Sequence, residues 1–275
     1  RGLGDVYKRQ STAYSAVHAW GFTTGEYRVP GPEELAELAG LMEAPMRLED
    51  QGVDHLTLIQ QEPLMAVAGI AARKKDGETV SGDAGTYFKR GDGTLYVLLC
   101  DGMGSGPQAN RESSLALRLL EQFLQAGVET EHALVTLNSA LALRGEEAGG
   151  FTTVDLLQVD LFTGDGAVFK LGAAPTYVRK GGTVRRISGT SLPAGLEAEE
   201  RSAPDRFPIH LSPGDCVVLV SDGVTGTEDD SWLRERLVKF DQGSPKELAR
   251  DLITHSPQGA TDDSTALVIR LEKRE

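Results

Sequence analysis

The sequence has little cysteine and no long hydrophobic segment. Its two cysteines, Cys100 and Cys216, each stand beside an aspartate within an apolar stretch, which is typical of buried thiols in a reducing compartment. No unbroken apolar run is long enough to span a bilayer, and residues 1–10 lack the apolar core of a signal peptide. We therefore expect a cytoplasmic domain without a disulfide framework, whose upstream regulatory or membrane domains lie outside this sequence.

The sequence also has little positive charge. Its 28 Lys and Arg residues stand against 41 Asp and Glu residues, which gives a formal net charge of -13. A nucleic-acid backbone or an anionic membrane would be repelled, so we expect no nucleic-acid partner. The 40% of hydrophobic residues is ordinary for a soluble globular protein. A chain of 275 residues accommodates one large domain with an appendage.

The pattern of the chain changes near residue 55. Residues 1–10 look like a fragment edge, and residues 11–54 carry no strand signal as strong as those that follow. Leu35, Leu38 and Leu41 have helical spacing after Pro32, which predicts one short amphipathic helix. We expect a linker or regulatory segment over residues 1–54 and the main domain over residues 55–275.

The sequence of the main domain predicts strands, then a pair of helices, further strands, two more helices and a last strand. The first helix is expected to open with Pro107, which suits a first helical position, and the second to cover residues 131–144. Alternating strands joined by tight turns follow Gly150, and two helices precede a last strand over residues 265–271. This order predicts an α+β fold of stacked sheets flanked by helices, rather than a parallel βαβ sheet.

Asp-Gly dipeptides occur five times, and most of them suit ordinary turns. Asp76, Asp92 and Asp165 lie in polar connections between strand-like segments. Asp101 and Asp222 differ, because each follows a long apolar strand at the point where that strand stops. A carboxylate placed there is rigid and partly desolvated, which is costly unless a cation or several donors compensate it.

Two further acidic positions complete a set of four. Asp83 lies in VSGDAG, and Asp262 begins the pair Asp262-Asp263 just before the last strand. Aspartate oxygens suit hard divalent ions such as magnesium and manganese, and two such ions can activate a water against phosphorus. A turn or cap role fits any single one of these aspartates equally well, so the inference depends on the whole set.

Five motifs together resemble those of a known enzyme family. VSGDAG, LLCDGMGSG, FTTVDL, LVSDG and DDST occur in the order and approximate spacing of the metal-dependent (PPM, type 2C) serine/threonine phosphatases. DGMGSGPQANRES and NSALALR are especially similar to the stage II sporulation protein E (SpoIIE) branch. The resemblance covers roughly residues 55–273 and implies an αββα sandwich, with two antiparallel sheets flanked by helix pairs.

The resemblance also implies a catalytic site with two manganese or magnesium ions. Asp101 would bridge both ions, with the carbonyl of Gly102 as a further ligand, and a bridging water would be the nucleophile. Asp83, Asp222 and Asp262 would complete the ligand set, while Asp263 would cap or support it. The substrate would be a phosphoserine protein, an anti-anti-sigma factor in sporulation control, and whether the chain forms a homodimer stays open.

Several features of the sequence leave alternatives open. No histidine lies near the motifs, so no general acid is assigned. Three basic residues precede VSGD, namely Arg73, Lys74 and Lys75. They could orient the phosphate of a substrate, or they could belong to a solvated loop. Glycines 82, 102 and 223 would let the backbone approach ions closely.

Two other functions compete with the phosphatase interpretation. GMGSG after a strand mimics the fingerprint of a dinucleotide-binding oxidoreductase, although a helix pair follows it and an aspartate precedes it. A catalytically weak partner-binding module with the phosphatase fold is the second alternative. The presence of all four expected carboxylates argues against it.

Overall fold

The computed structural model describes residues 16–20, 31–51, 55–144, 150–196, 203–226, 229–241 and 243–274. The chain forms two compact units, of which unit 1 comprises residues 1–63 with 274–275 and unit 2 comprises residues 64–273. Within the described residues, no helix is both long and apolar enough to cross a membrane.

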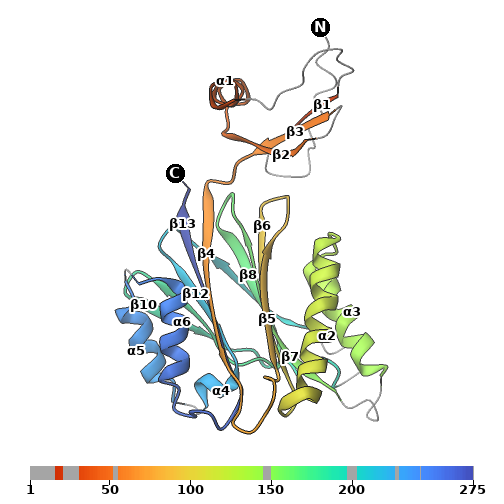
Figure 1. Ribbon diagram of the computed structural model, residues 1–275, viewed down its shortest axis with the longest axis vertical. Coiled ribbons are helices and arrows are strands. Elements are labelled where there is room, and N and C mark those ends of the chain that lie inside the picture. Colours follow the sequence, from red (N-terminus) through yellow and green to blue (C-terminus); the bar gives the residue numbers. More distant parts are fainter. Residues whose placement is uncertain are drawn as a thin grey trace. The chain divides into compact units, whose positions relative to one another are not determined.

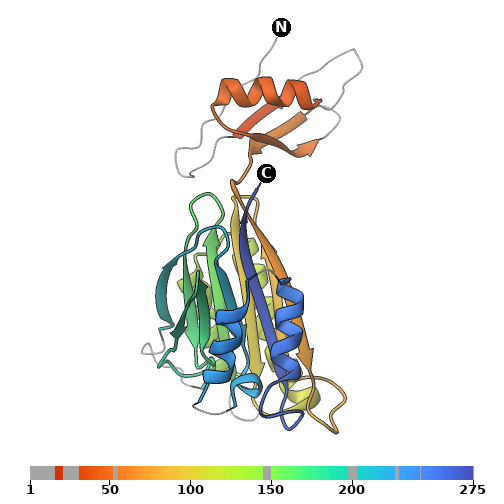
Figure 2. The same ribbon diagram turned by 90° about the vertical axis from the view of Figure 1, so that its left-hand side faces the viewer.

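Unit 1 combines one helix with a small antiparallel sheet (Figure 2). The strands lie in the order β1-β3-β2, with bounds β1 (Ala16–Trp20), β2 (Met46–Gln51) and β3 (His55–Gln60). The helix expected after Pro32 is confirmed as α1 (Pro32–Met42). Leu35 and Leu38 pack near Met46 and Leu58, whereas Leu41 is 77% exposed. The buried face of α1 is therefore narrower than the leucine spacing predicts.

The boundary between the units lies later than residue 55. The segment over residues 55–60 was expected to open the main domain, but β3 pairs with β1 and β2 instead. Unit 2 accordingly begins at Leu64. The residue pattern of a strand predicts that it will join a sheet, but it does not specify which sheet. The predicted start of the main domain at residue 55 is therefore corrected to Leu64.

Unit 2 is built on two five-stranded antiparallel sheets (Figure 1). The first has the order β10-β9-β12-β13-β4, and the second has the order β11-β8-β7-β6-β5. The bounds of the first-sheet strands are β4 (Leu64–Arg73), β9 (Thr176–Lys180), β10 (Thr183–Ile187), β12 (Cys216–Val220) and β13 (Ser264–Lys273). The bounds of the second-sheet strands are β5 (Asp83–Lys89), β6 (Thr94–Gly102), β7 (Thr152–Asp160), β8 (Asp165–Leu171) and β11 (Asp205–His210).

Helix pairs cover the outer faces of both sheets (Figure 1). One pair, α2 (Gly106–Gln125) and α3 (Thr130–Ala142), packs on the sheet that contains β6, and Pro107 lies in the first turn of α2 as expected. The other pair is α5 (Ser231–Lys239) and α6 (Pro245–Thr254), and the short α4 (Asp222–Thr225) follows β12. The predicted α+β sandwich of two antiparallel sheets and flanking helices is confirmed.

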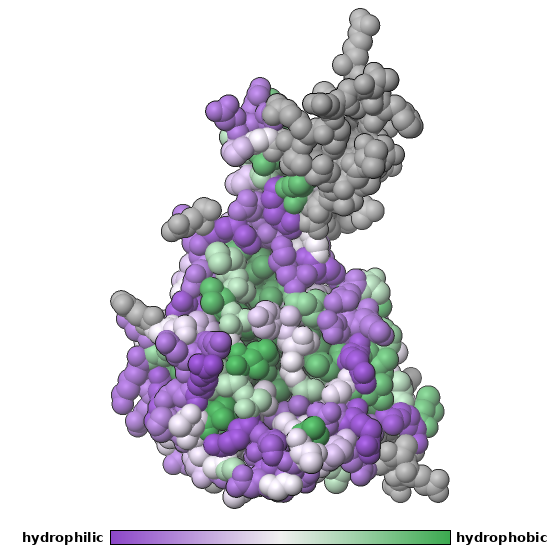
Figure 3. Space-filling view, in the orientation of Figure 1, coloured by the Kyte–Doolittle hydropathy of each residue, from purple (hydrophilic) through white to green (hydrophobic). Residues whose placement is uncertain are grey.

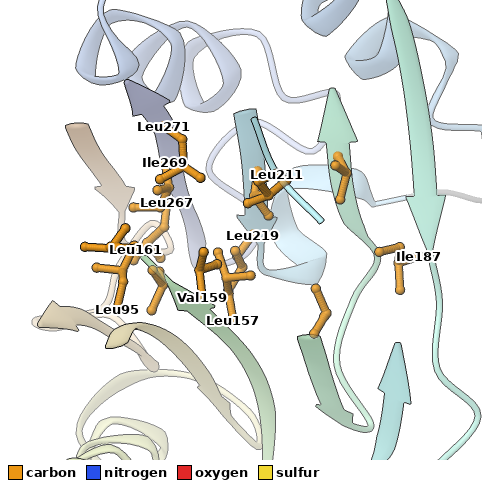
Figure 4. Packing of buried hydrophobic residues seen from close by; sticks show 14 of the residues in the cluster. Leu95, Leu157, Val159, Leu161, Ile187, Leu211, Leu219, Leu267, Ile269 and Leu271 are labelled. Carbon is orange, nitrogen blue, oxygen red and sulfur yellow. The ribbon is translucent and has the colours of Figure 1, made fainter. Parts of the chain in front are cut away.

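The core lies in three layers because both faces of each sheet are covered. Between the sheets, Leu157 and Val159 face Leu219 and Leu267 (Figure 4). Strand β6 illustrates the alternation that this requires. Val97 and Leu99 belong to the layer between the sheets, whereas Tyr96 and Leu98 pack with α2 and α3. A strand buried on both faces reads as one continuous apolar run, as LYVLLC does.

The edge strands β4 and β5 leave a hydrophobic strip on one face of unit 2. Figure 3 shows hydrophobic residues over the middle of this face, with hydrophilic residues along both sides. Ile70 on β4 and Tyr87 on β5 are exposed large hydrophobic residues. Gly69 on β4 is required by packing, because a Cβ atom there would lie 2.2 Å from the backbone nitrogen of Lys246 at the start of α6.

Candidate active site

Asp83 and Asp101 lie directly opposite each other on neighbouring strands. Asp83 is the first residue of β5, and its Cα partner on β6 is Asp101. Like charges in such a cross-strand position repel each other. Asp83 is buried, and among the described residues neither of its carboxylate oxygens has a partner in good hydrogen-bond geometry. Two facing carboxylates, one of them buried without a well-placed donor, call for a positive charge.

The other sheet delivers Asp222 and Asp262 to the same end of the sandwich. Strand β12 ends at Val220, and Asp222 begins α4 immediately afterwards. Ser221 fixes this junction, because its hydroxyl accepts a hydrogen bond from the Thr265 backbone nitrogen at 2.8 Å. Asp262 precedes β13 by two residues. Each sheet therefore supplies two of the four carboxylates that the sequence singled out.

Burial and mutual repulsion raise the pKa values of this cluster. Burial, followed by the charges of Asp83 and Asp222, raises the pKa of Asp101. Burial and then the charge of Asp262 raise the pKa of Asp222. Burial also raises the pKa of Asp83. A full set of ionised carboxylates is thus unfavourable here unless cations neutralise it.

A cavity of about 370 Å³ opens at this cluster. Its lining residues are Lys75, Asp101, Gly102, Met103, Gly104, Phe151, Thr153, Asp222 and Asp262. The donor set of carboxylate and carbonyl oxygens fits hard divalent ions. In the described part of the chain, no three His, Cys, Asp or Glu side chains are already arranged to hold an ion.

The two members of the Asp262-Asp263 pair face different surroundings. Asp262 lines the cavity, whereas Asp263 is buried and accepts hydrogen bonds from the backbone nitrogens of Lys75, at 2.9 Å, and Gly82, at 2.8 Å. Asp263 therefore ties the segment before β5 to the start of β13. This geometry favours Asp262 as the metal-facing residue and gives Asp263 a supporting position.

The glycines around the site are required by contacts between backbones. A Cβ atom on Gly102 would lie 2.1 Å from the Ala109 carbonyl oxygen on α2. A Cβ atom on Gly223 would lie 1.9 Å from the Asp263 carbonyl oxygen. Glycine at these positions was expected to allow close approach to ions, and in the structure it allows close packing of backbone against backbone. Gly102 in particular allows α2 to pack against the strand end that carries Asp101.

A buried ion pair beneath the site was missed by the sequence analysis. Asp155 on β7 and Lys170 on β8 are cross-strand partners, and their charged groups lie 2.8 Å apart. The ammonium of Lys170 also donates to the Thr176 hydroxyl at 2.7 Å. Asp155 is paired with Leu99, two residues before Asp101. The signal was present in VDLL and FKLG, where one charged residue interrupts each apolar strand.

Histidines play no visible part in the cavity. His132, His210 and His255 are exposed on unit 2 and lie beside carboxylates instead. No histidine of the described residues lines the cavity.

The fold and the site together define a PP2C-type protein serine/threonine phosphatase domain. The family model of stage II sporulation protein E (SpoIIE) matches residues 91–272, and the chain belongs to this family. The chain is 29% identical over 231 residues to stage II sporulation protein E of Priestia megaterium, a match that covers 81% of this chain and 39% of that protein. It is 28% identical over 233 residues to the Bacillus subtilis (strain 168) protein, with 80% of this chain and 27% of that protein covered. The chain thus spans less than half the length of these relatives.

Solved structures support the same fold. The PP2C phosphatase domain with a fragment of the regulatory domain of SpoIIE from Bacillus subtilis matches with a TM-score of 0.73 and 24% identity, over 97% of this chain and 81% of that chain. RsbX in complex with magnesium matches with a TM-score of 0.61 and 18% identity, over 82% of this chain and 100% of that chain. The dinucleotide-binding alternative is wrong, because both sheets of unit 2 are antiparallel over the described residues.

Proposed function

We propose that this domain hydrolyses phosphoserine or phosphothreonine in a protein substrate with the help of two divalent cations, manganese or magnesium. Asp83, Asp101, Asp222 and Asp262, together with the Gly102 carbonyl, would hold the cations. The observation that carries the proposal is the pair of facing aspartates, because Asp83 is buried and no donor of the described residues is in good hydrogen-bond geometry with its oxygens. A buried carboxylate without a partner is costly, and bound cations would remove that cost.

The residues of the chain would place the phosphoryl group above the carboxylate cluster. Cations held there supply Lewis acidity, which lowers the pKa of water and offsets charge on the phosphoryl oxygens. In the reaction, a water oxygen forms a bond to phosphorus while the bond from phosphorus to the serine oxygen breaks. The serine oxygen takes up a proton, and inorganic phosphate leaves. The open cavity at the strand ends gives both water and product a route.

We further propose that the substrate is an anti-anti-sigma-like phosphoprotein that acts in sporulation control. Membership of the SpoIIE family supports this assignment. The cavity is lined mainly by glycines and carboxylates around the phosphate position, so it offers little recognition of a particular side chain. Specificity would then come from the surface of a folded partner. Equal turnover of a folded phosphoprotein and a broad phosphopeptide panel would contradict a dedicated partner.

Unit 1 would be part of a regulatory region that precedes the phosphatase domain. Its separate sheet and its own small core support this role. The similarity to a structure that includes a regulatory-domain fragment also extends over 97% of this chain. Hydrogen exchange of unit 2 with and without substitutions in the α1 core, such as Leu38→Ala, would test whether the units communicate. Identical exchange in unit 2 would contradict a regulatory role.

The decisive test of the proposed function is turnover in the presence of manganese. The chain is expected to release phosphate from p-nitrophenyl phosphate and from a phosphoserine protein, and excess chelator should abolish both reactions. Strong activity in chelator would overturn the metal proposal. A chain that binds manganese through Asp101 without turnover would favour the alternative of a catalytically weak binding module.

A further inference from the structure

The segment between β4 and β5 carries three consecutive basic residues that have different surroundings. The guanidinium of Arg73 donates to the Gly259 carbonyl oxygen, and the ammonium of Lys74 donates to the Glu78 carbonyl oxygen. These two residues are occupied in holding backbone. Lys75 lines the carboxylate cavity, and within the described residues its ammonium has no hydrogen-bond or ion-pair partner.

The backbone around Lys75 is fixed on several sides. Its nitrogen donates to Oδ1 of Asp263 at 2.9 Å, and its carbonyl oxygen accepts from the Glu78 nitrogen at 3.2 Å. The next nitrogen, that of Asp76, donates to the Ala260 carbonyl oxygen at 2.9 Å. Because Asp263 directly follows Asp262, the position of Lys75 is set relative to the carboxylates. A segment anchored in this way presents its side chain to the cavity at little cost in backbone entropy.

Charge balance explains why a cation is useful at this position. Four ionised aspartates and two divalent cations would together be neutral. A phosphorylated serine then brings about 1.5 to 2 further negative charges at neutral pH. Among the described residues that line the cavity, Lys75 is the only one with a cationic side chain. The ammonium of a lysine is a compact point charge that binds phosphate by charge-assisted hydrogen bonds.

We propose that Lys75 binds the phosphoryl group of the substrate and of the product phosphate. This assignment rests on the proposed function and adds a specific substrate-contacting residue to it. The ammonium draws the phosphoryl group toward the carboxylate end of the cavity and offsets negative charge on its outer oxygens. The segment is held by Arg73 and by the backbone contacts of Lys75 and Asp76, and neither Arg73 nor Lys74 contacts the substrate.

The test compares Lys75→Gln and Lys75→Arg with the neighbouring control Lys74→Gln. With p-nitrophenyl phosphate and manganese, Lys75→Gln should raise KM and the inhibition constant of inorganic phosphate by about tenfold or more, the size expected for a lost hydrogen bond to a charged group. Lys75→Arg should recover part of this loss, because it keeps the charge. Lys74→Gln should stay within about twofold of the wild type, since exposed charge changes have small effects.

Calorimetry separates the role of Lys75 from the proposed function itself. Manganese affinity and thermal stability should be unchanged in Lys75→Gln, while the affinity of the manganese-loaded protein for inorganic phosphate falls. A wild type without turnover would contradict the proposed function, yet phosphate calorimetry would still test Lys75. An unchanged inhibition constant and phosphate affinity in Lys75→Gln would overturn this inference. So would a loss of manganese binding equal to the loss of phosphate binding.

Discussion

Two pairs of cross-strand neighbours in the same sheet have opposite electrostatics. Asp155 and Lys170 face each other on β7 and β8 with opposite charges 2.8 Å apart. Asp83 and Asp101 face each other on β5 and β6 with the same charge and no donor on Asp83. The first pair is compensated within the protein and is a structural element. No cationic side chain pairs with the second pair among the described residues, and we expect bound cations to compensate it.

The largest expected effect comes from removing one charge of the uncompensated pair. Asp101→Asn should lower kcat/KM by at least about 100-fold, since loss of a metal ligand exceeds the effects usual for residues behind the ligands. In chelator, the same substitution should leave the midpoint of thermal unfolding nearly unchanged, because the raised pKa of Asp101, about 10, keeps its carboxyl protonated at neutral pH and an amide replaces one uncharged group by another. Asp165→Asn, at the exposed first residue of β8, is the matched control. Loss of stability together with near-normal activity in Asp101→Asn would reverse the comparison.

The compensated pair should respond in the opposite way. Lys170→Met leaves Asp155 buried without its partner and should reduce the free energy of unfolding by about 3 to 5 kcal/mol. The double variant Lys170→Met with Asp155→Leu should recover most of this loss, because no uncompensated charge remains. Urea unfolding measures both. A double variant no more stable than Lys170→Met would show that Asp155 has a further role, such as support of the neighbouring carboxylates.

The sequence predicted the sandwich of two antiparallel sheets correctly, whereas the metal-binding role of its aspartates stays a prediction. Asp101 and Asp222 stood out in the sequence because each follows a long apolar strand at its end. An Asp-Gly dipeptide at such a place is not explained by a hairpin turn. Whether these residues lie close to Asp83 depends on the register of the strands. The residue pattern does not specify that register, and only the resemblance to the phosphatase family implied it. The place of β3 in unit 1 was missed for the same physical reason. Strand patterns specify a buried face, and sheet membership depends on contacts distant in sequence.

The pH dependence of stability should distinguish the two pairs further. Burial raises the pKa of Asp83 from 3.8 to about 6. A carboxyl whose pKa is raised by folding favours the folded state while it is protonated, and this stability is lost as the pH rises through that interval. In chelator, Asp83→Asn should therefore flatten the decline in stability between about pH 4 and pH 6 relative to the wild type. Chemical denaturation across this range measures it, and an equally steep decline in Asp83→Asn would contradict the assignment.

The smallest effect is expected at Asp263, which supports the site without lining the cavity. Asp263 accepts from the Lys75 nitrogen through one oxygen and from the Gly82 nitrogen through the other. Asp263→Asn keeps one acceptor and replaces the other by a donor, so one of these two contacts is lost. We expect kcat/KM to decrease by several-fold to about tenfold. If the contact to Lys75 is the one lost, KM for p-nitrophenyl phosphate should change more than the affinity for manganese. Combining Asp263→Asn with Lys75→Gln should then add little to Lys75→Gln alone, because Asp263 would act only by positioning the Lys75 ammonium, which Lys75→Gln already removes. Fully additive losses would show that Asp263 acts through Gly82 and the adjoining Asp83 instead.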